Sequence, residues 1–264
     1  MKPISKYQGL VIKTKDYKEN ASLVTIITKD FKQNYVVKGT KKINSKTAKW
    51  INFFNYISFN ATDTPNLNTL TEAYVINYFP NINIDQDKLE VAFIISEKLD
   101  LFFEQVNDTN KLFEFTLKIL ELLEKTNYPK QVLQLFEIKI MYLLGISPVL
   151  NQCVKCGNMN DHNNDDNKFF FSVLLGGVIC KKCMIYDEFN SNNFILNNEL
   201  TKVFKYLYYI KIENVDEEFL KLIFEIEKIS GEKELNKTID LYYQEYLDFT
   251  SKVKKVYLAM RGEQ

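Results

Sequence analysis

The amino-acid sequence predicts an α+β protein, in which a small N-terminal β-barrel is followed by an α-helical domain with an inserted four-cysteine element. Three observations lead to this fold class. Short β-branched runs fill the first eighty residues, apolar residues recur at helical spacing after Pro80, and all four cysteines fall into two close pairs. We expect the barrel to span residues 1–80 and the helical domain 81–264, with the cysteine insertion at 150–190.

The N-terminal region has the pattern of a five-stranded barrel. Compact runs rich in β-branched or aromatic residues are separated by polar turns, and they lie at 9–12, 22–28, 34–37, 52–59 and 71–76. We expect turns at 16–20, 30–32 and 61–66. Five short strands in this length fit an OB-fold, a barrel that binds oligonucleotides on one face, although an SH3-like barrel would give much the same pattern.

After Pro80 the apolar residues recur every three or four positions, as they do in helices. Three such stripes lie before the cysteines, at 89–103, 112–123 and 132–144. Asp108 or Asn110 is expected to cap the second helix, Pro129 lies near the start of the third, and Gly145 is expected to end it. Three more helices are expected at 198–212, 216–230 and 235–258. Helices on both sides of the cysteines can then pack into one body, which makes the cysteine element an insertion.

The four cysteines form two pairs with two residues between partners, Cys153 with Cys156 and Cys180 with Cys183. One tight turn per pair aims two thiolates at the same point, and four thiolates complete the tetrahedral shell of a structural zinc. The 23 residues between the pairs exceed the ~15–20 of the commonest spacing, and a polar loop takes up the excess. Apolar runs on both sides of Gly176-Gly177 predict a β-hairpin that delivers the second pair.

Disulfides or reduced thiols are the alternatives to a zinc site. Disulfides need an oxidising compartment, and the N-terminal residues contain no apolar segment of a signal peptide. We therefore expect a cytoplasmic protein that holds one structural zinc ion. A catalytic zinc is disfavoured, because four thiolates leave no open position and the only histidine, His162, is not followed by the acid that zinc deaminases require.

Charge is unevenly distributed along this chain, whose formal net charge is zero. Residues 1–80 hold 12 lysines and 5 acids, which is typical of a module that binds a polyanion, although lysines also serve solubility alone. Lysines in this region can neutralise backbone phosphates, and an aromatic ring can stack on a base. The candidate nucleic-acid contacts are Lys13, Lys15, Tyr35, Lys38, Lys41, Lys42 and Lys46, with Tyr17 a weaker candidate.

The sequence contains no signature of an enzyme or of a membrane protein. It has no phosphate-binding glycine loop, no dinucleotide-binding motif and no zinc-protease motif. No apolar stretch reaches the ~18–20 residues of a membrane span. We therefore expect a non-enzymatic protein with no membrane association.

Several segments resemble the RecO family of bacterial recombination mediators. They are the opening stretch Gly9–Asn20, the basic stretch Val36–Lys42, the passage Phe136–Pro148 into the first cysteine pair, and the passage Phe171–Cys180 into the second. The resemblance covers nearly the whole chain. It implies an N-terminal OB-fold on a helical domain with a zinc finger.

For function, the resemblance implies binding of single- and double-stranded DNA and annealing of complementary strands. It also implies action with RecR to help RecA replace the single-strand-binding protein SSB, whose C-terminal tail the helical domain can hold. The chain departs from the expected pattern in having a single arginine, Arg261, so lysines would make the phosphate contacts without a bidentate fork. The alternative function is a zinc-containing protein-interaction scaffold that does not bind DNA.

Overall fold

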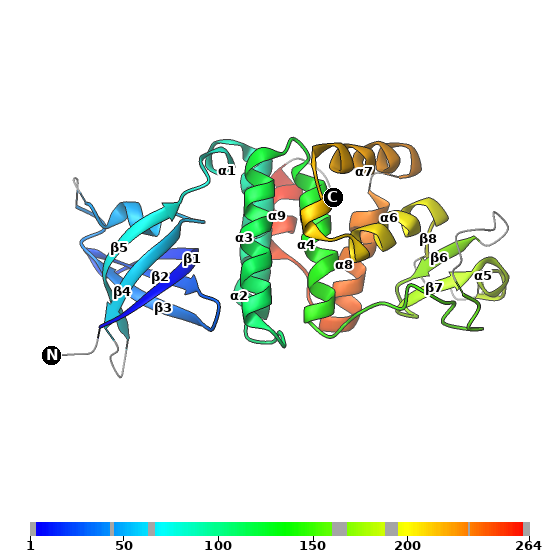
Figure 1. Cartoon of the computed structure of the whole chain (residues 1–264), viewed down its shortest axis with the longest axis horizontal. Helices are drawn as coiled ribbons and strands as arrows, with labels where there is room; N and C mark the ends of the chain where they lie inside the picture. The colour runs from blue at the N-terminus through cyan, green and yellow to red at the C-terminus, as the bar shows by residue number, and fades with distance from the viewer. Residues whose placement is uncertain are drawn as a thin grey trace. The chain divides into compact units, whose positions relative to one another are not determined.

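The computed structural model describes residues 4–42, 45–62, 67–159, 168–187, 195–231 and 233–260. The chain divides into two compact units, residues 1–125 and 126–264, which we call the barrel unit and the helical unit. The predicted fold class is confirmed, because a five-stranded closed barrel precedes a helical body in sequence (Figure 1), and the four cysteines cluster within that body. Three helices belong to the barrel unit as well, and the boundary predicted at residue 80 remains a prediction.

The barrel closes in the strand order β1-β2-β3-β5-β4. Its strands are β1 (Ile4–Tyr17), β2 (Ala21–Ile27), β3 (Lys32–Lys38), β4 (Tyr56–Thr62) and β5 (Asn68–Asn77). The first half of β1 pairs with β4 and its second half with β2, so this one strand closes the barrel. A bulge between Val11 and Lys13 shifts the register of the pairing between β1 and β2. Gly9 precedes the bulge, where a Cβ would lie only 2.5 Å from the Ile26 side chain.

Inward-facing side chains from all five strands fill the barrel. The core residues are Val11, Val24, Ile26, Tyr35, Val37, Ile51, Ile57, Phe59, Ala61, Leu70 and Ala73. The strand predicted at 52–59 is wrong at its start, because β4 begins at Tyr56. A 3₁₀ helix, η1 (Ala48–Ile51), precedes it, and the buried Phe54 has a φ of 64° and donates its N–H to the Val11 carbonyl. This left-handed residue turns the chain into β4.

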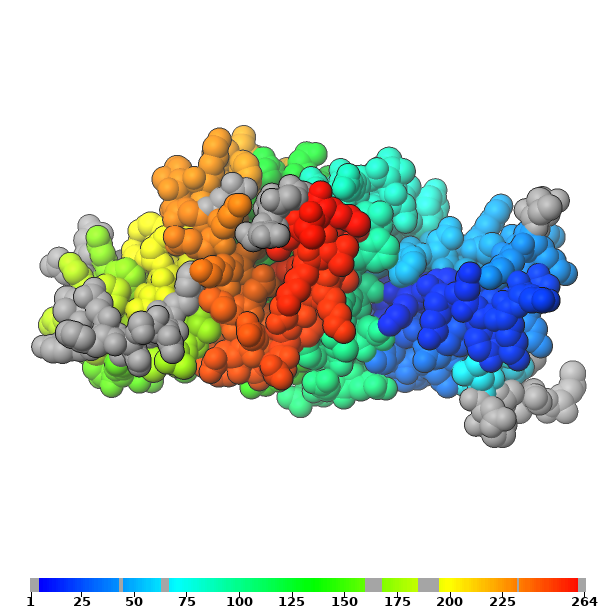
Figure 2. All heavy atoms as spheres, turned by 180° about the vertical axis from the view of Figure 1, so that it is seen from behind, coloured from blue at the N-terminus to red at the C-terminus, as the bar shows by residue number. Residues whose placement is uncertain are grey.

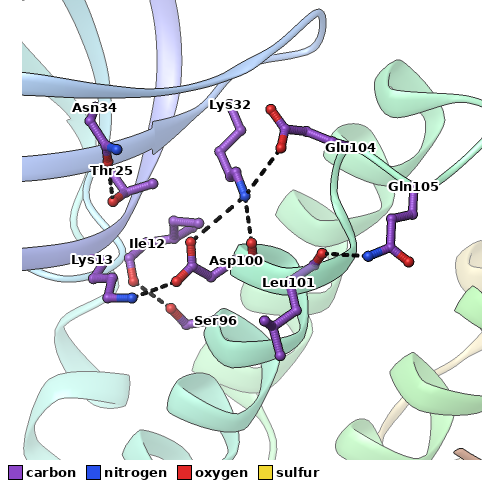
Figure 3. A network of polar contacts seen from close by, with 10 residues as sticks. All are labelled: Ile12, Lys13, Thr25, Lys32, Asn34, Ser96, Asp100, Leu101, Glu104 and Gln105. Atoms are coloured by element: carbon purple, nitrogen blue, oxygen red, sulfur yellow. Dashed lines mark hydrogen bonds and ion pairs between the residues drawn. The ribbon is translucent and has the colours of Figure 1, made fainter. Parts of the chain in front are cut away.

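The helices of the barrel unit are α1 (Pro80–Ile84), α2 (Gln86–Phe102) and α3 (Thr109–Lys125). Asp108 accepts a hydrogen bond from the Lys111 N–H, so Asp108 caps α3, whereas the other predicted candidate, Asn110, lies inside the helix. Helix α2 packs on β1, where the Ser96 hydroxyl donates to the Ile12 carbonyl (Figure 3). Because Ser96 is buried, this contact satisfies polar groups at the packed face of α2.

The helical unit is built from α4 (Pro129–Leu143), α6 (Asn198–Tyr209), α7 (Glu217–Ser230), α8 (Glu234–Leu247) and α9 (Lys252–Met260), with a 3₁₀ turn η2 (Ile212–Asn214). Pro129 starts α4 and Gly145, with φ of 73°, follows its end, as predicted. The single helix predicted at 235–258 is wrong, because Asp248 adopts φ of 49° and separates α8 from α9. Figure 2 shows α9 (red) on the surface of this unit, and none of its residues is buried.

The cysteine element lies between α4 and α6 in sequence. It contains a three-stranded sheet, β7-β6-β8, made of β6 (Phe169–Ser172), β7 (Gly177–Cys180) and β8 (Ile195–Leu196), together with α5 (Lys181–Asp187). The predicted hairpin around Gly176-Gly177 is confirmed as β6 and β7. Phe171 of β6 stacks on Phe204 of α6 with ring centroids 4.6 Å apart, which seats the hairpin on the helices. Helix α4 contacts α6, α7 and α8, so helices from both sides of the insertion do pack together.

None of the described helices combines the length and the apolar character that a membrane crossing requires. The longest two, α2 and α3, have 17 residues each. Both carry charged residues within their span.

Candidate metal centre and nucleic-acid interface

The structure brings all four cysteines together at one end of the helical unit. Cys153 and Cys156 lie on the turn after α4, Cys180 ends β7, and Cys183 lies in α5. Their four sulfur atoms lie within 4.8 Å of one another, and none is in a disulfide. Segments 27 residues apart in the chain thus converge on one point, as the two pairs predicted.

Backbone hydrogen bonds fix both sides of this cluster. The Val154 N–H donates to the Val178 carbonyl at 2.9 Å, which ties the first cysteine turn to β7. Within the turn, the Gly157 N–H donates to the Cys153 carbonyl at 2.9 Å, and Gly157 has φ of 73°. A residue other than glycine would strain this left-handed position.

The hairpin needs glycine at position 177 for a different reason, because the backbone of another segment lies very close to it. A Cβ on Gly177 would lie 2.4 Å from the Val149 carbonyl oxygen and 2.8 Å from the Val154 side chain. The Val149 N–H donates to the Gly176 carbonyl and the Val178 N–H to the Val149 carbonyl, each at 2.9 Å. The hairpin therefore lies directly against the chain that leads into the first cysteine pair.

The spacing of the sulfur atoms suits a tetrahedral metal ion. Zinc–thiolate bonds of about 2.3 Å place neighbouring sulfurs of a tetrahedron about 3.8 Å apart. The Cys156 and Cys180 sulfurs are 3.7 Å apart, and the upper limit of 4.8 Å for the others needs only small side-chain movements. Cys153 and Cys180 are buried, Cys183 is partly buried and Cys156 is exposed. The cluster could therefore hold a metal ion with four thiolate ligands.

Electrostatics of the cluster also favour a cation. Burial raises the pKa of Cys153, but hydrogen bonds accepted from three backbone N–H groups, that of Cys180 among them, outweigh burial and lower the pKa to about 6. Burial and the neighbouring sulfurs raise the pKa of Cys183 to about 12. One thiolate therefore forms readily, and its charge opposes further ionisation. A bound dication removes this opposition.

Other features predicted for the cysteine element have mixed outcomes. His162 and part of the predicted insertion, residues 160–167 and 188–190, lie outside the described residues. Strand β8 was not predicted, since it has only two residues and pairs with β6 across a gap of more than twenty residues. Lys155, Lys181 and Lys182 are exposed around the cluster.

The second candidate site is the lysine-rich stretch that follows β3. Lys38 ends β3, and Lys41, Lys42 and Lys46 come after it in the turns that lead to η1. All four side chains are exposed, and Lys41 forms an ion pair of 3.0 Å with the exposed Asp16. Within the described ranges, the remaining three have no acidic partner. We call these four residues the lysine loop.

The two lysines predicted on the opening strand have different surroundings. Lys13 and Lys15 both lie in β1, and both are exposed. Lys13 forms an ion pair of 2.5 Å with Asp100 of α2 (Figure 3). Lys15 has no ion pair with any described residue. The charge of Lys15 is thus available to a ligand, whereas the charge of Lys13 is already paired with Asp100 of α2.

Tyr35 is placed differently from the prediction. Its ring is 1% exposed in the barrel core, where it packs edge-on against Phe59 with centroids 5.2 Å apart. A base can stack only on a ring face that solvent reaches, so this placement corrects the proposed stacking role. Tyr17 is partly exposed, with the Lys18 ammonium 5.3 Å from its ring centroid.

The comparisons with known proteins agree with this architecture. The family model "Recombination protein O N terminal" matches residues 1–79, and "Recombination protein O C terminal" matches residues 85–255. The chain belongs to the RecO family. Proteins named DNA repair protein RecO from Bacillus subtilis and Listeria monocytogenes are each 28% identical to it, over 96% of this chain and 93% of theirs. The RecO of Bacillus pumilus is 28% identical, over 95% of this chain and 92% of its own.

One exposed group on the barrel of this RecO-family chain escaped the sequence prediction. Tyr74 of β5 is 55% exposed and lies beside Lys6 of β1. The alternation in β5 places Ala73 inward and Tyr74 outward, and this alternation could have shown from the sequence that Tyr74 is exposed. The pairing of β1 with β4, which brings Lys6 near, could not be derived from the sequence.

Proposed function

We propose that this chain is a DNA repair and homologous recombination mediator that binds single- and double-stranded DNA and anneals complementary strands. The single observation that carries the proposal is that both RecO family models match, and together they cover nearly the whole chain. The relatives that match over 90% or more of their own length are named DNA repair proteins. Membership of the family gives the activity class, and the barrel gives the surface that would bind DNA.

The lysine loop supports the DNA-binding part of the proposal. Lys38, Lys42 and Lys46 are exposed and have no described acidic partner, so their charges are available to phosphates. Two more candidates are the exposed Lys15 of β1 and Lys41, which forms an ion pair with Asp16. An ammonium group contacts a phosphate without reading the base, which gives binding that depends on salt and not on sequence. That mode suits a protein that must act on any pair of complementary strands.

The proposed partners follow from the family. With RecR, the protein would help load RecA onto single-stranded DNA coated with SSB, and the helical unit would hold the SSB C-terminal tail. No hydrolysis of nucleotide is part of this proposal, and we place the protein at the nucleoid in the cytoplasm. These steps require binding surfaces and not a catalytic group.

We further propose that the metal held by the four cysteines is zinc, one ion per chain. The support is the donor set, because four cysteine thiolates gathered at one point are typical of structural zinc, and the four sulfur atoms lie within 4.8 Å of one another. Four protein ligands leave no position for water or substrate. The ion would therefore stabilise the sheet on α6 and supply no chemistry.

A mobility-shift titration with a single-stranded oligonucleotide tests DNA binding against the alternative, a protein-interaction scaffold. We expect binding at low salt that weakens steeply as salt increases, because lysine contacts release counterions. Absence of binding at the lowest salt would favour the scaffold. The same titration with duplex DNA measures whether both forms bind.

A further inference from the structure

A shallow pocket opens on the outer face of strands β1, β4 and β5, which lie side by side in the barrel (Figure 1). It has a volume of about 200 Å³, below the ~300–1,000 Å³ of pockets that enclose a whole small molecule. The lining residues are Lys6, Ser58, Phe59, Asn60, Glu72, Ala73 and Tyr74. Its size suits one flat ring of a longer ligand.

Two neighbouring rungs of the sheet supply the polar groups of this pocket. Lys6 pairs with Asn60, and Asn60 pairs with Glu72, so these three side chains form the first rung. Ser58 pairs with Tyr74 on the next rung. Even-numbered residues of β4 face outward while Ile57 and Phe59 face the core, so all five side chains share one face.

Tyr74 presents an aromatic ring to solvent at the mouth of this pocket. Its side chain is 55% exposed, and the Lys6 ammonium lies 5.8 Å from the ring centroid. The Ser58 hydroxyl and the charge of Lys6 lower the pKa of the Tyr74 phenol. A large exposed ring beside a cation is the pairing that single-strand binders use, with stacking for the base and charge for the phosphate.

We propose that this pocket binds one base of a single-stranded nucleic acid, stacked on Tyr74. The proposal rests on the proposed DNA-binding function and adds a second contact surface to the lysine loop. Lys6 would contact the adjoining phosphate. The Glu72 carboxylate, which accepts a hydrogen bond from Asn60 at 3.2 Å, repels phosphate and attracts an exocyclic amine. The backbone therefore runs on the Lys6 side, and bases with an amino group, such as cytosine, are favoured over thymine.

The test is fluorescence anisotropy of labelled oligo(dC) and oligo(dT) with the full chain and three variants. Tyr74→Ala removes the ring, Tyr74→Phe keeps it, and Tyr78→Ala removes a 61% exposed tyrosine that does not line the pocket. We expect Tyr74→Ala to weaken single-strand binding by about five-fold or more, since stacking on one ring is worth ~1–3 kcal/mol. Tyr78→Ala should stay within about two-fold of the original affinity, and Tyr74→Phe, which keeps the ring, should lose less affinity than Tyr74→Ala.

Base preference gives a second readout. The unchanged chain should bind oligo(dC) a few-fold more tightly than oligo(dT), and Glu72→Ala should reduce this ratio toward one. Equal loss in Tyr74→Ala and Tyr78→Ala, or no loss in either, would overturn the pocket while leaving DNA binding by the lysine loop intact. Failure of the unchanged chain to bind any oligonucleotide would overturn both proposals. Circular dichroism of each variant establishes that the barrel remains folded.

Discussion

The Lys13 Nζ atom lies 2.5 Å from Asp100 Oδ2, an ion pair that joins strand β1 to helix α2 within the barrel unit (Figure 3). Lys32 adds to it, because its ammonium donates to the Asp100 carbonyl at 2.5 Å and lies 3.6 Å from the Glu104 carboxylate. Asp100 is 28% exposed and Lys32 only 17%. Two lysines of the basic barrel thus hold α2, and their charge is partly neutralised there.

Asp100→Ala should destabilise the barrel unit by roughly 1–2 kcal/mol, since it leaves the partly buried Lys32 with one carboxylate fewer. Lys13→Ala should cost less, because Lys13 is 51% exposed and exposed ion pairs contribute about 0–1 kcal/mol. Urea unfolding of the two variants measures the difference. If Lys13→Ala lost more free energy of unfolding than Asp100→Ala, the contacts of Asp100 with Lys32 would not be the stabilising ones.

Reversing the charge of the lysine loop should weaken DNA binding. The triple variant Lys38→Glu, Lys41→Glu, Lys42→Glu should lower the salt-dependence slope for single-stranded DNA by about 2, since each lost phosphate contact removes ~0.7. The matched control reverses three exposed lysines of the helical unit, Lys211, Lys221 and Lys228, with the same change of net charge. Equal effects of the two variants would indicate an effect of net charge alone and not of the loop.

Elemental analysis of the protein purified without chelator should find one zinc per chain. Cys153→Ser should lose the metal and expose the cysteine element to protease, because metal binding and local folding are linked. Lys155→Ala, an exposed neighbour inside the same turn, is the control and should keep the metal. A metal-free protein whose element resists protease would contradict a structural zinc.

Lys139 of α4 should titrate well below other lysines. Burial lowers the pKa of its ammonium from 10.5 to about 8, while its Nζ donates to the Tyr208 carbonyl at 2.6 Å. Between pH 8 and 10.5 the unfolded chain holds more protons at this residue, so its contribution to stability increases as pH rises through this window. NMR of reductively methylated lysines measures the titration, with Lys139→Arg to assign the signal. An apparent pKa near 10.5 would contradict this burial.

Local patterns in the sequence predicted much of the fold. The β-branched runs, the helical stripes and the two cysteine pairs each depend on residues close in sequence, and each has its counterpart in the structure. Asp108 and Pro129 mark helix starts through backbone chemistry alone. The errors depend on long-range geometry instead. The break at Asp248 interrupts an apolar stripe that continues past it, so periodicity could not locate it.

In the candidate sites, too, local features were predictable and features that depend on long-range packing were not. The cysteine cluster was predictable because metal-ligand spacing is local. Tyr35 was misplaced because nothing in the run Asn34–Val37 shows which alternate face points inward, whereas the barrel closure buries it. Lys13 and Lys15 are two residues apart on one strand, yet only Lys13 meets Asp100, which lies 87 residues away. Which charges remain free thus depends on packing that the sequence does not display.

The most direct test of the proposed mediator function is annealing of complementary DNA strands coated with SSB, followed by fluorescence resonance energy transfer between end labels. We predict that the unchanged chain accelerates annealing, that the triple lysine-loop variant loses most of this acceleration, and that the helical-unit control keeps it. Annealing at the rate of SSB-coated strands alone, from a folded and metal-loaded protein, would contradict the account.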